Sequence, residues 1–416
     1  MRKMILLLFP LVLFAQSYLI SNIPIPKTYI QNLDPYPCDD ECLQQYIEHD
    51  MIFSFLANAD KKLENEEQDE IRMMQISILN LGSHIITGKL RIALLLPYKI
   101  IGRYAASTTN SAFSYLITKN RAFELKSYKI ESENEEDIEE ALAKIQKDGF
   151  SYVIAPLTKN GVDRIIDINP EMNIYFPTIN KNDANSSSPY LFYGGIDYKA
   201  QTNMLLKEAV SPLVIFYDKS AIGKKLSLYE EESFKDKSFL DDSTDISTIS
   251  KNNRVIKYSI PRRTTNLERQ LKRNSRINEG SFFLNTPIVK SGMIMSQLTL
   301  YDANATNVLS TQINYDPILL SITQYNDRKD MIVANSITEQ NNVLIESNAL
   351  LSNDIIYDWI NYTTTVGVDY FFNLLTNDSR EYNIDLQDNQ MIYKIELLQP
   401  SFSRFKKYTS TTSKER

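Results

Sequence analysis

Residues 91–97 read Arg-Ile-Ala-Leu-Leu-Leu-Pro, and this stretch decides the fold class. A continuous apolar run without alternation is typical of a strand buried on both faces, as in a parallel sheet. Strand-like and helix-like segments alternate along the chain from this point. Such alternation predicts an α/β protein, in which right-handed β-α-β units build a doubly wound sheet.

The alternation forms two successive sets, which predict two lobes. In the first set we expect strands at 91–97, 123–130, 152–155 and 174–179, with helices at 106–119, 136–147 and 161–168. The second set opens with a helix at 198–209. It continues with strands at 213–217, 255–260, 281–284, 307–312 and 331–335, and with helices at 222–234, 265–274 and 291–300. A helix at 354–375 and a late strand at 390–399 follow.

A short helical region precedes the first lobe. Apolar residues at helical spacing predict one helix over 43–63 and another over 66–81, where Gly82 would follow the helix end. The two form a helical hairpin, like one unit of an α-α repeat. A single unit of that kind does not bury its own apolar face, so we expect it to dock on another surface.

The first residues have the pattern of a secretory signal peptide. Arg2 and Lys3 precede an apolar run from Met4 to Ala15, which is shorter than the roughly 20 residues that span a bilayer. The alternatives are an uncleaved anchor and a buried core segment. No cysteine follows the run, so the sequence has no lipobox there. The pattern predicts export to the periplasm, with membrane contact only through an uncleaved signal peptide.

The predicted organisation divides the chain into seven parts. They are a signal peptide (1–15), an extended proline-bearing leader (16–37), the helical hairpin (38–89), lobe 1 (90–196), lobe 2 (197–345), a C-terminal helix and strand that return to the lobes (346–405) and a disordered basic tail (406–416).

Cys38 and Cys42 are the only cysteines. Placed one turn apart on a helix, their Cα atoms would lie about 6 Å apart, within disulfide range. An oxidising compartment favours a disulfide. A metal or redox site is the alternative, but redox and haem-attachment motifs have two intervening residues instead of three.

The amino-acid composition excludes several classes of protein. The chain has 416 residues, of which 43% are hydrophobic and 23% charged, and its net charge is −7. These values exclude a disordered chain, collagen and a coiled coil, and they give no sign of a nucleic-acid binder. Only two histidines and 11 glycines are present. The chain has no phosphate loop, no Gly-x-Ser-x-Gly and no His-Glu-x-x-His, so we expect a non-enzymatic protein without metal or cofactor.

The order of segments resembles the type I periplasmic-binding-protein fold superfamily. Within it, a helical region before two lobes is most similar to the penicillin-binding-protein activators, lipoproteins of LppC type. The local resemblances are residues 91–97 with Gly102-Arg103-Tyr104-Ala105-Ala106 after them, and Ile154-Ala-Pro-Leu-Thr158. The first is similar to the opening strand and turn of that family. The second is similar to its glycine-proline-leucine segment, with Ala155 in place of the glycine.

The fold implies where a ligand would bind. In open α/β sheets, ligands lie beyond the carboxyl ends of the strands. Hydroxyls, backbone amides and an acid or arginine hold the charged ends of an amino acid in the relatives that bind small ligands. The candidates at these positions are Arg103, Tyr104, Thr158, Asn180 and Asp197. The alternatives are ordinary loop residues and a cleft that is closed, as in relatives that bind proteins.

Other segments carry weaker signals. Residues 251–276 are basic, with Glu268 as the sole acid, which indicates a solvated helix face or a surface for an acidic partner or anionic wall polymer. Residues 310–315, 321–324 and 361–365 are rich in hydroxyls and amides. They should line a polar surface or satisfy one another. Trp359 and its tyrosine neighbours indicate core packing or an aromatic contact surface.

These expectations lead to one leading hypothesis and one alternative. The leading one is a periplasmic binding or scaffold protein of the bacterial cell envelope, which contacts an envelope protein and regulates a peptidoglycan-synthesis or other envelope complex, as the resemblance implies. The alternative is a receptor for an amino-acid-like small ligand.

Overall fold

The structure, a computed structural model, describes residues 30, 32, 38–59, 63–79, 90–119, 121–236 and 254–409. It divides into two units: one comprises Met1–Lys89 with Asn120–Ala122, and the other comprises Leu90–Lys119 with Phe123–Arg416. The predicted signal peptide, all of the leader except two residues, and the end of the tail lie outside the described residues. Within the described part, no helix is long and apolar enough to cross a membrane.

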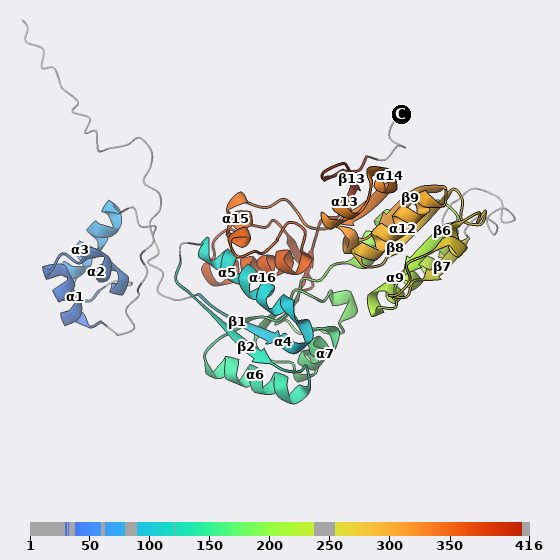
Figure 1. The fold of residues 1–416 in the computed structure, drawn as a ribbon. Helices are drawn as coiled ribbons and strands as arrows, with labels where there is room; N and C mark the ends of the chain where they lie inside the picture. Colours follow the sequence, from blue (N-terminus) through green and yellow to red (C-terminus); the bar gives the residue numbers. More distant parts are fainter. Residues whose placement is uncertain are drawn as a thin grey trace, which may run out of the picture. The chain divides into compact units, whose positions relative to one another are not determined.

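The described part of the first unit contains three short helices, α1 (Asp40–Glu48), α2 (Ile52–Asn58) and α3 (Glu66–Ile78), coloured blue in Figure 1. The predicted helix over 43–63 is therefore two helices, because the backbone turns at Asp50, where φ is 51°. Leu43, Phe55 and Leu56 form the small core. The Sγ atoms of Cys38 and Cys42 lie 2.01 Å apart, at disulfide distance.

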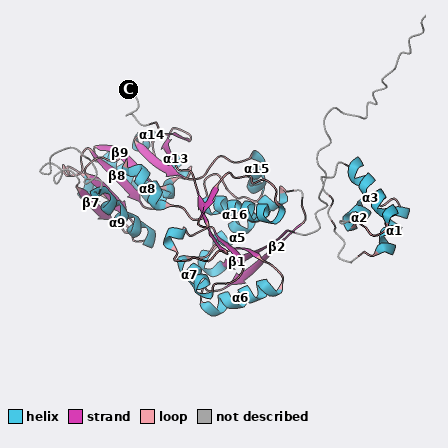
Figure 2. Cartoon of the chain, turned by 180° about the vertical axis from the view of Figure 1, so that it is seen from behind, coloured by secondary structure: helices cyan, strands magenta, loops and turns pink. Residues whose placement is uncertain are grey.

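The second unit is built on two seven-stranded sheets, drawn in magenta in Figure 2. The first has the order β11-β12-β5-β4-β3-β1-β2. Its strands are β1 (Leu90–Pro97), β2 (Phe123–Ile130), β3 (Tyr152–Ile154), β4 (Asn173–Phe176), β5 (Leu191–Tyr193), β11 (Asp385–Gln387) and β12 (Gln390–Ile392). The associated helices are α4 (Tyr98–Ile101), α5 (Arg103–Ile117), α6 (Glu135–Lys147), α7 (Lys159–Ile168), η1 (Lys181–Asp183), α15 (Asn342–Leu350) and α16 (Trp359–Thr376).

The second sheet has the order β14-β13-β10-β9-β8-β6-β7, which repeats the pattern of the first. Its strands are β6 (Leu213–Tyr217), β7 (Val255–Ser259), β8 (Gly280–Asn285), β9 (Ala305–Ser310), β10 (Met331–Asn335), β13 (Glu396–Pro400) and β14 (Phe405–Lys407). The associated helices are α8 (Tyr198–Leu206), α9 (Ala221–Asp236), α11 (Glu268–Leu271), α12 (Ile288–Leu300), η3 (Gln312–Asn314), α13 (Ile318–Ile322) and α14 (Tyr325–Arg328). Two doubly wound lobes, as the sequence predicts, are confirmed.

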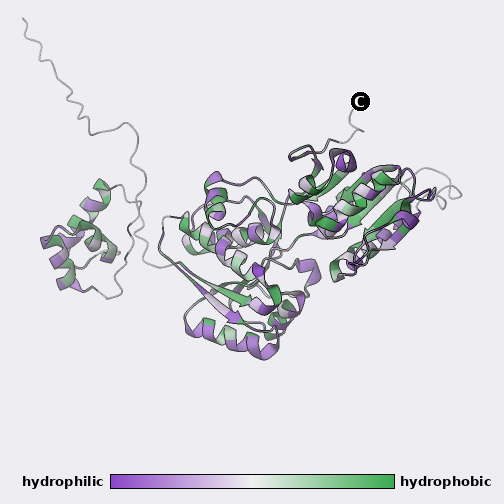
Figure 3. Cartoon of the chain, viewed as in Figure 1, coloured by the Kyte–Doolittle hydropathy of each residue, from purple (hydrophilic) through white to green (hydrophobic). Residues whose placement is uncertain are grey.

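Burial of β1 on both faces explains the apolar run at 91–97. Ile92, Leu94 and Leu96 of β1 lie in one hydrophobic cluster, whereas Ala93 and Leu95 lie in another. β1 is therefore buried on both faces, and it pairs in parallel with β2 and β3. Figure 3 shows the opposite pattern in α6, which is largely hydrophilic and turns a narrow apolar face to the sheet.

The chain passes between the lobes three times. Residues 194–197 lead from β5 to α8, residues 336–341 from β10 to α15, and residues 393–395 from β12 to β13. We call these segments the first, second and third crossovers. The predicted late strand at 390–399 is therefore two strands, one in each sheet. Hydrophobicity alone does not distinguish them, because both are short and half-apolar.

Other expectations also differ from the structure. The helix predicted over 354–375 begins only at Trp359. The helix predicted over 265–274 is reduced to α11, since Arg269 and Arg273 would repel at helical spacing and Arg273 has a φ of 52°. The tail predicted from residue 406 begins later, because Lys406 and Lys407 pair with Gln399 and Leu398 in an antiparallel ladder.

Candidate functional site

The predicted ligand residues lie beyond the carboxyl ends of the strands of lobe 1, in loops or at the start of a helix. Thr158 begins α7, Asn180 precedes η1, Asp197 begins α8, and Arg103 and Tyr104 begin α5. A polar group binds a ligand strongly only when its hydrogen-bonding capacity is free, so the partners of each side chain decide what this region can bind.

Thr158 is occupied by a carboxylate of the chain itself. Glu133, which is only 4% exposed, accepts the Thr158 N–H at 2.8 Å, the Thr158 hydroxyl, and the Gly161 N–H at 3.2 Å. A Cβ on Gly161 would lie 2.7 Å from Cδ of Glu133, so glycine makes this approach feasible. Glu133 therefore fills the anion-binding start of α7, and sequence reasoning missed it.

Asn180 also has partners within the chain. Its Nδ2 donates to the Gly195 carbonyl at 3.1 Å, and its Oδ1 accepts the Asn182 N–H at 3.0 Å. A Cβ on Gly195 would lie 2.3 Å from the Asn180 backbone nitrogen. Asn180 is therefore a buried side chain that fixes the first crossover against the loop after β4.

Asp197 is a helix cap, while Arg103 and Tyr104 are exposed. The Asp197 carboxylate accepts the Ala200 N–H at 2.9 Å and so caps α8. The Arg103 guanidinium lies 5.2 Å from the centre of the Tyr104 ring. Of the five predicted residues, Arg103 and Tyr104 retain the most freedom to contact a ligand.

A shallow depression lies between η1 of lobe 1 and helices α8 and α9 of lobe 2. It encloses about 350 Å³, part of which is open to solvent, and its lining comprises Asn180, Asn182, Asp183, Ile196, Asp197, Tyr198, Lys199, Lys225, Leu226 and Tyr229. Lys225 of α9 forms an ion pair with Asp183 of η1 across it. The depression thus brings together Asn180 and Asp197, but not Arg103, Tyr104 or Thr158.

The start of α16 binds all three crossovers. The Thr363 hydroxyl donates to the Gly194 carbonyl of the first crossover at 2.9 Å and lies 3.0 Å from the Tyr393 hydroxyl of the third. The neighbouring Tyr362 hydroxyl lies 2.8 Å from the Thr338 hydroxyl of the second. Two adjacent residues, Tyr362 and Thr363, therefore connect the three crossovers. The threonine-rich run at 361–365 is buried and only partly satisfied: Thr365 donates to the Asn361 carbonyl, whereas Thr364 Oγ1 and Asn361 Oδ1 have no partner among the described residues.

Aromatic rings also connect the lobes. The ring centre of Tyr315 in lobe 2 lies 5.1 Å from that of Tyr357, which precedes α16. It lies 4.9 Å from the ring centre of Phe405 in β14. Tyr315 packs against the core clusters of both lobes. Trp359 lies 4.7 Å from the Tyr393 ring and packs on the core of lobe 1, in agreement with the core-packing interpretation.

The amide-rich run at 310–315 is bonded mainly to residues outside it near the second crossover, and Thr311 Oγ1 and Asn314 Oδ1 are buried without a partner among the described residues. Gln201 of α8 donates to Ser336 Oγ at 2.7 Å, and its Oε1 accepts the Gln312 N–H at 2.9 Å. Gln312 donates in turn to Asn335 at 3.0 Å. These buried amides hold α8, η3 and the end of β10 together.

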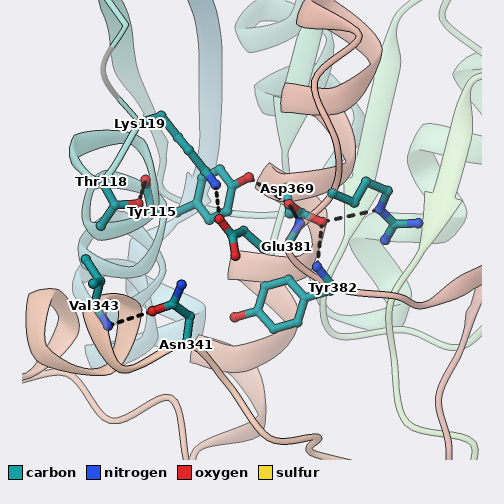
Figure 4. A network of polar contacts seen from close by, with 9 residues as sticks. Tyr115, Thr118, Lys119, Asn341, Val343, Asp369, Glu381 and Tyr382 are labelled. Atoms are coloured by element: carbon teal, nitrogen blue, oxygen red, sulfur yellow. Dashed lines mark hydrogen bonds and ion pairs between the residues drawn. The ribbon is translucent and has the colours of Figure 1, made fainter. Parts of the chain in front are cut away.

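A buried carboxylate anchors the C-terminal part of lobe 1, as Figure 4 shows. Asp369 of α16, with no exposed surface, accepts the Tyr115 hydroxyl of α5 at 2.7 Å and the Glu381 N–H at 2.8 Å. Arg380 Nε lies 3.3 Å from the other carboxylate oxygen. Burial, followed by the Asp369 charge, raises the pKa of Tyr115.

A second buried carboxyl lies in lobe 2. Glu230 of α9 has no exposed surface, and Asn285 Nδ2 donates to its two oxygens at 2.9 and 2.7 Å. Burial raises the pKa of Glu230 well above its ordinary value, against the lowering effect of Asn285. In the described part of the chain, no group of three histidine, cysteine or acidic residues is placed to hold a metal ion.

Neither a protein-family model nor a curated protein matches the sequence. Solved structures do match the fold. LivJ from Streptococcus pneumoniae, in complex with isoleucine, is 10% identical, with 76% of this chain and 98% of LivJ covered and a TM-score of 0.54. The leucine-binding protein LivK from Thermotoga maritima is 12% identical, with 77% and 98% covered and a TM-score of 0.53.

LpoA from Haemophilus influenzae also matches. It is 11% identical, with 86% of this chain and 69% of LpoA covered and a TM-score of 0.50. LivJ and LivK are binding proteins for amino acids. The chain therefore has the type I periplasmic-binding-protein fold, which it shares with amino-acid-binding proteins and with LpoA.

Proposed function

We propose that this chain is a non-enzymatic, extracytoplasmic two-lobed protein that acts through contacts with other proteins of the cell envelope. The observation that carries the proposal is the internal occupation of the predicted ligand groups. Glu133 takes the donors of Thr158 and Gly161, and Asn180 and Asp197 hold backbone groups. A ligand carboxylate would have to displace a buried carboxylate, which is costly.

The crossovers support the same proposal. A receptor that closes on a ligand changes the angle between its lobes at these segments. Here Tyr362 and Thr363 hydrogen-bond the crossovers, and the aromatic contacts of Tyr315 add packing between the lobes. A fixed lobe angle suits a protein surface that is recognised as it stands. The similarity of fold to LpoA fits regulation of a peptidoglycan-synthesis complex as the finer form of the proposal.

The second candidate is a receptor for an amino-acid-like ligand. It is favoured by the depression between η1, α8 and α9 and by the fold that this chain shares with LivJ. In this case Asn180 and Asp197, in the wall of the depression, would contact the ligand. Tyr198 would donate a hydrogen bond as an uncharged group, because burial raises its pKa.

A thermal-shift screen against amino acids, peptides and wall fragments separates the two. A ligand at 100 times its Kd adds about 2.7 kcal/mol to the free energy of unfolding. We expect no saturable rise in Tm with any of them. A saturable rise that is lost in Arg103→Ala or Thr158→Ala would establish the receptor and overturn the proposal.

A further inference from the structure

Lobe 2 carries a row of exposed apolar side chains on three helices and one turn. We call this row the α12–α14 face. Its members and their exposed fractions are Val289 (68%), Ile318 (48%), Ile322 (42%), Tyr325 (36%) and Phe402 (75%). Large side chains of this type are usually buried, and clusters of them at the surface mark interaction sites.

The members come from neighbouring elements. A Cβ on Gly292 of α12 would lie 2.8 Å from Cδ1 of Ile322, so α13 packs directly on α12. Val289 precedes Gly292 by one helical turn, on the same side of the helix. Ser296 then donates to Asp327 of α14 at 2.9 Å. Figure 1 shows α13 and α14 next to β13 in this lobe.

Phe402 is exposed and yet firmly held. Its ring is stacked on Tyr325, with the ring centres 4.0 Å apart and the planes at 16°. Arg328, only 3% exposed, donates to the Ser401 carbonyl at 3.1 Å, to the Phe402 carbonyl at 3.0 Å and to the Thr323 carbonyl. A buried guanidinium therefore fixes the turn that presents the phenylalanine. Rigid aromatic side chains lose little conformational entropy on binding.

A basic loop borders the α12–α14 face. Lys290, next to Val289, donates to the Arg262 carbonyl at 3.1 Å and to the Thr264 carbonyl at 2.5 Å. These two hydrogen bonds hold the loop after β7, in which Arg262 and Arg263 are exposed. Neither arginine has an ion-pair partner among the residues that the structure describes. Their charge is thus available although the whole chain has a net charge of −7.

We propose that the α12–α14 face, with Arg262 and Arg263 at its border, binds an acidic protein surface that carries an aromatic or aliphatic side chain. This inference rests on the proposed function and specifies the partner chemistry. Arginine and aromatic residues together are typical of protein interfaces. Arg262 and Arg263, which have no ion-pair partner in the described part of the chain, favour an acidic partner, and the stacked rings of Phe402 and Tyr325 favour an apolar side chain on that partner.

The test uses the full chain and two probes, a random glutamate–tyrosine copolymer and poly-glutamate. Binding is measured by biolayer interferometry at low and moderate salt. The variants are Arg262→Glu with Arg263→Glu, and Phe402→Ala. The matched controls are Lys129→Glu with Lys147→Glu, which make the same charge change on exposed residues of lobe 1, and Leu350→Ala, an exposed apolar residue there.

We expect the copolymer to bind more tightly than poly-glutamate, and its affinity to fall with salt. The arginine reversal should weaken both probes at least tenfold. Phe402→Ala should weaken the copolymer about fivefold and remove the preference for it. Both controls should bind like the original chain, and circular dichroism should show that all variants are folded.

Three results would overturn the inference. The first is the absence of copolymer binding, or binding that all variants share. The second is equally tight, arginine-dependent binding to phosphatidylglycerol vesicles, which would identify a membrane surface. The third is a dimer in sedimentation that Phe402→Ala dissociates, which would make a second copy the occupant. An amino-acid-dependent rise in Tm would refute the proposed function alone, and it would leave these binding results standing.

Discussion

Replacing Glu133 by alanine removes the acceptor of three hydrogen bonds at the start of α7. Hydrogen bonds to a charged group contribute about 1.5–3 kcal/mol each, and loss of a helix cap costs about 0.5–2 kcal/mol. Water that enters the vacated space recovers part of this. We therefore expect the free energy of unfolding to fall by about 2–4 kcal/mol, and Tm by about 4–10 °C.

Urea unfolding gives the measurement. Trp359 is the only tryptophan and lies in lobe 1, so its fluorescence reports on the lobe that contains Glu133. Glu133→Gln keeps an acceptor and should lose less stability than the alanine variant. Glu136→Ala is the matched control, because Glu136 is exposed on α6 of the same lobe and should change stability by less than about 0.5 kcal/mol.

Gly161 offers an independent check of the same geometry. Gly161→Ala places a methyl group against the Glu133 carboxylate and should destabilise lobe 1 although every hydrogen-bonding group remains. The reasoning is refuted if Glu133→Ala unfolds within about 0.5 kcal/mol of the original chain, since the carboxylate would then not be the partner that holds these donors.

Three further predictions concern buried polar groups. Because burial raises the pKa of Glu230, the folded state keeps a proton that the unfolded state releases. Stability should therefore fall as pH rises from the ordinary glutamate pKa to the raised one, by up to about 1.4 kcal/mol per pH unit. Glu230→Gln should abolish this slope in urea titrations at several pH values, whereas Glu231→Gln, at a carboxyl whose pKa Lys235 and Lys257 lower, should retain it. Asp369→Asn should cost about 2–4 kcal/mol in thermal unfolding, and the exposed Asp385→Asn less than about 0.5 kcal/mol. Thr363→Val removes the hydroxyl that joins two crossovers and should cost about 1–2 kcal/mol, with a wider spread of lobe angles in small-angle scattering; an unchanged profile would contradict the hinge assignment.

The strands of the sheet interiors could be predicted because burial on both faces leaves an apolar run. The predicted bounds of Leu213–Tyr217 and Met331–Asn335 agree with the interior strands β6 and β10, and those of Phe123–Ile130 agree with the edge strand β2. β5 has three residues, as the predicted β3 has, so length alone does not explain why β5 was missed. The helices α13, α14 and α15 were missed because α13 and α14 have at most five residues and α15 has no clear apolar face.

The candidate site could be located but not interpreted from sequence. The rule that loops at the carboxyl ends of strands face the cleft placed Thr158, Asn180 and Asp197 correctly in such loops. The partner of Thr158 is set by a tertiary contact, since Glu133 is 25 residues away, whereas Asp197 caps its helix locally through Ala200. The crossovers depend on longer contacts, such as the one between Thr363 and Gly194, which are 169 residues apart. Glu133 lies three residues beyond the end of β2, and the exposed Glu131 stands between them, so no local signal in the sequence marked Glu133 as the partner.

Isothermal titration calorimetry of the full chain with isoleucine and leucine, up to millimolar concentration, tests the central claim most directly. Because the chain's own carboxylate and backbone groups occupy Thr158, Asn180 and Asp197, we predict no saturable heat with either amino acid. A saturable heat with a Kd in the micromolar range, abolished by Arg103→Ala, would contradict the account and establish a solute receptor.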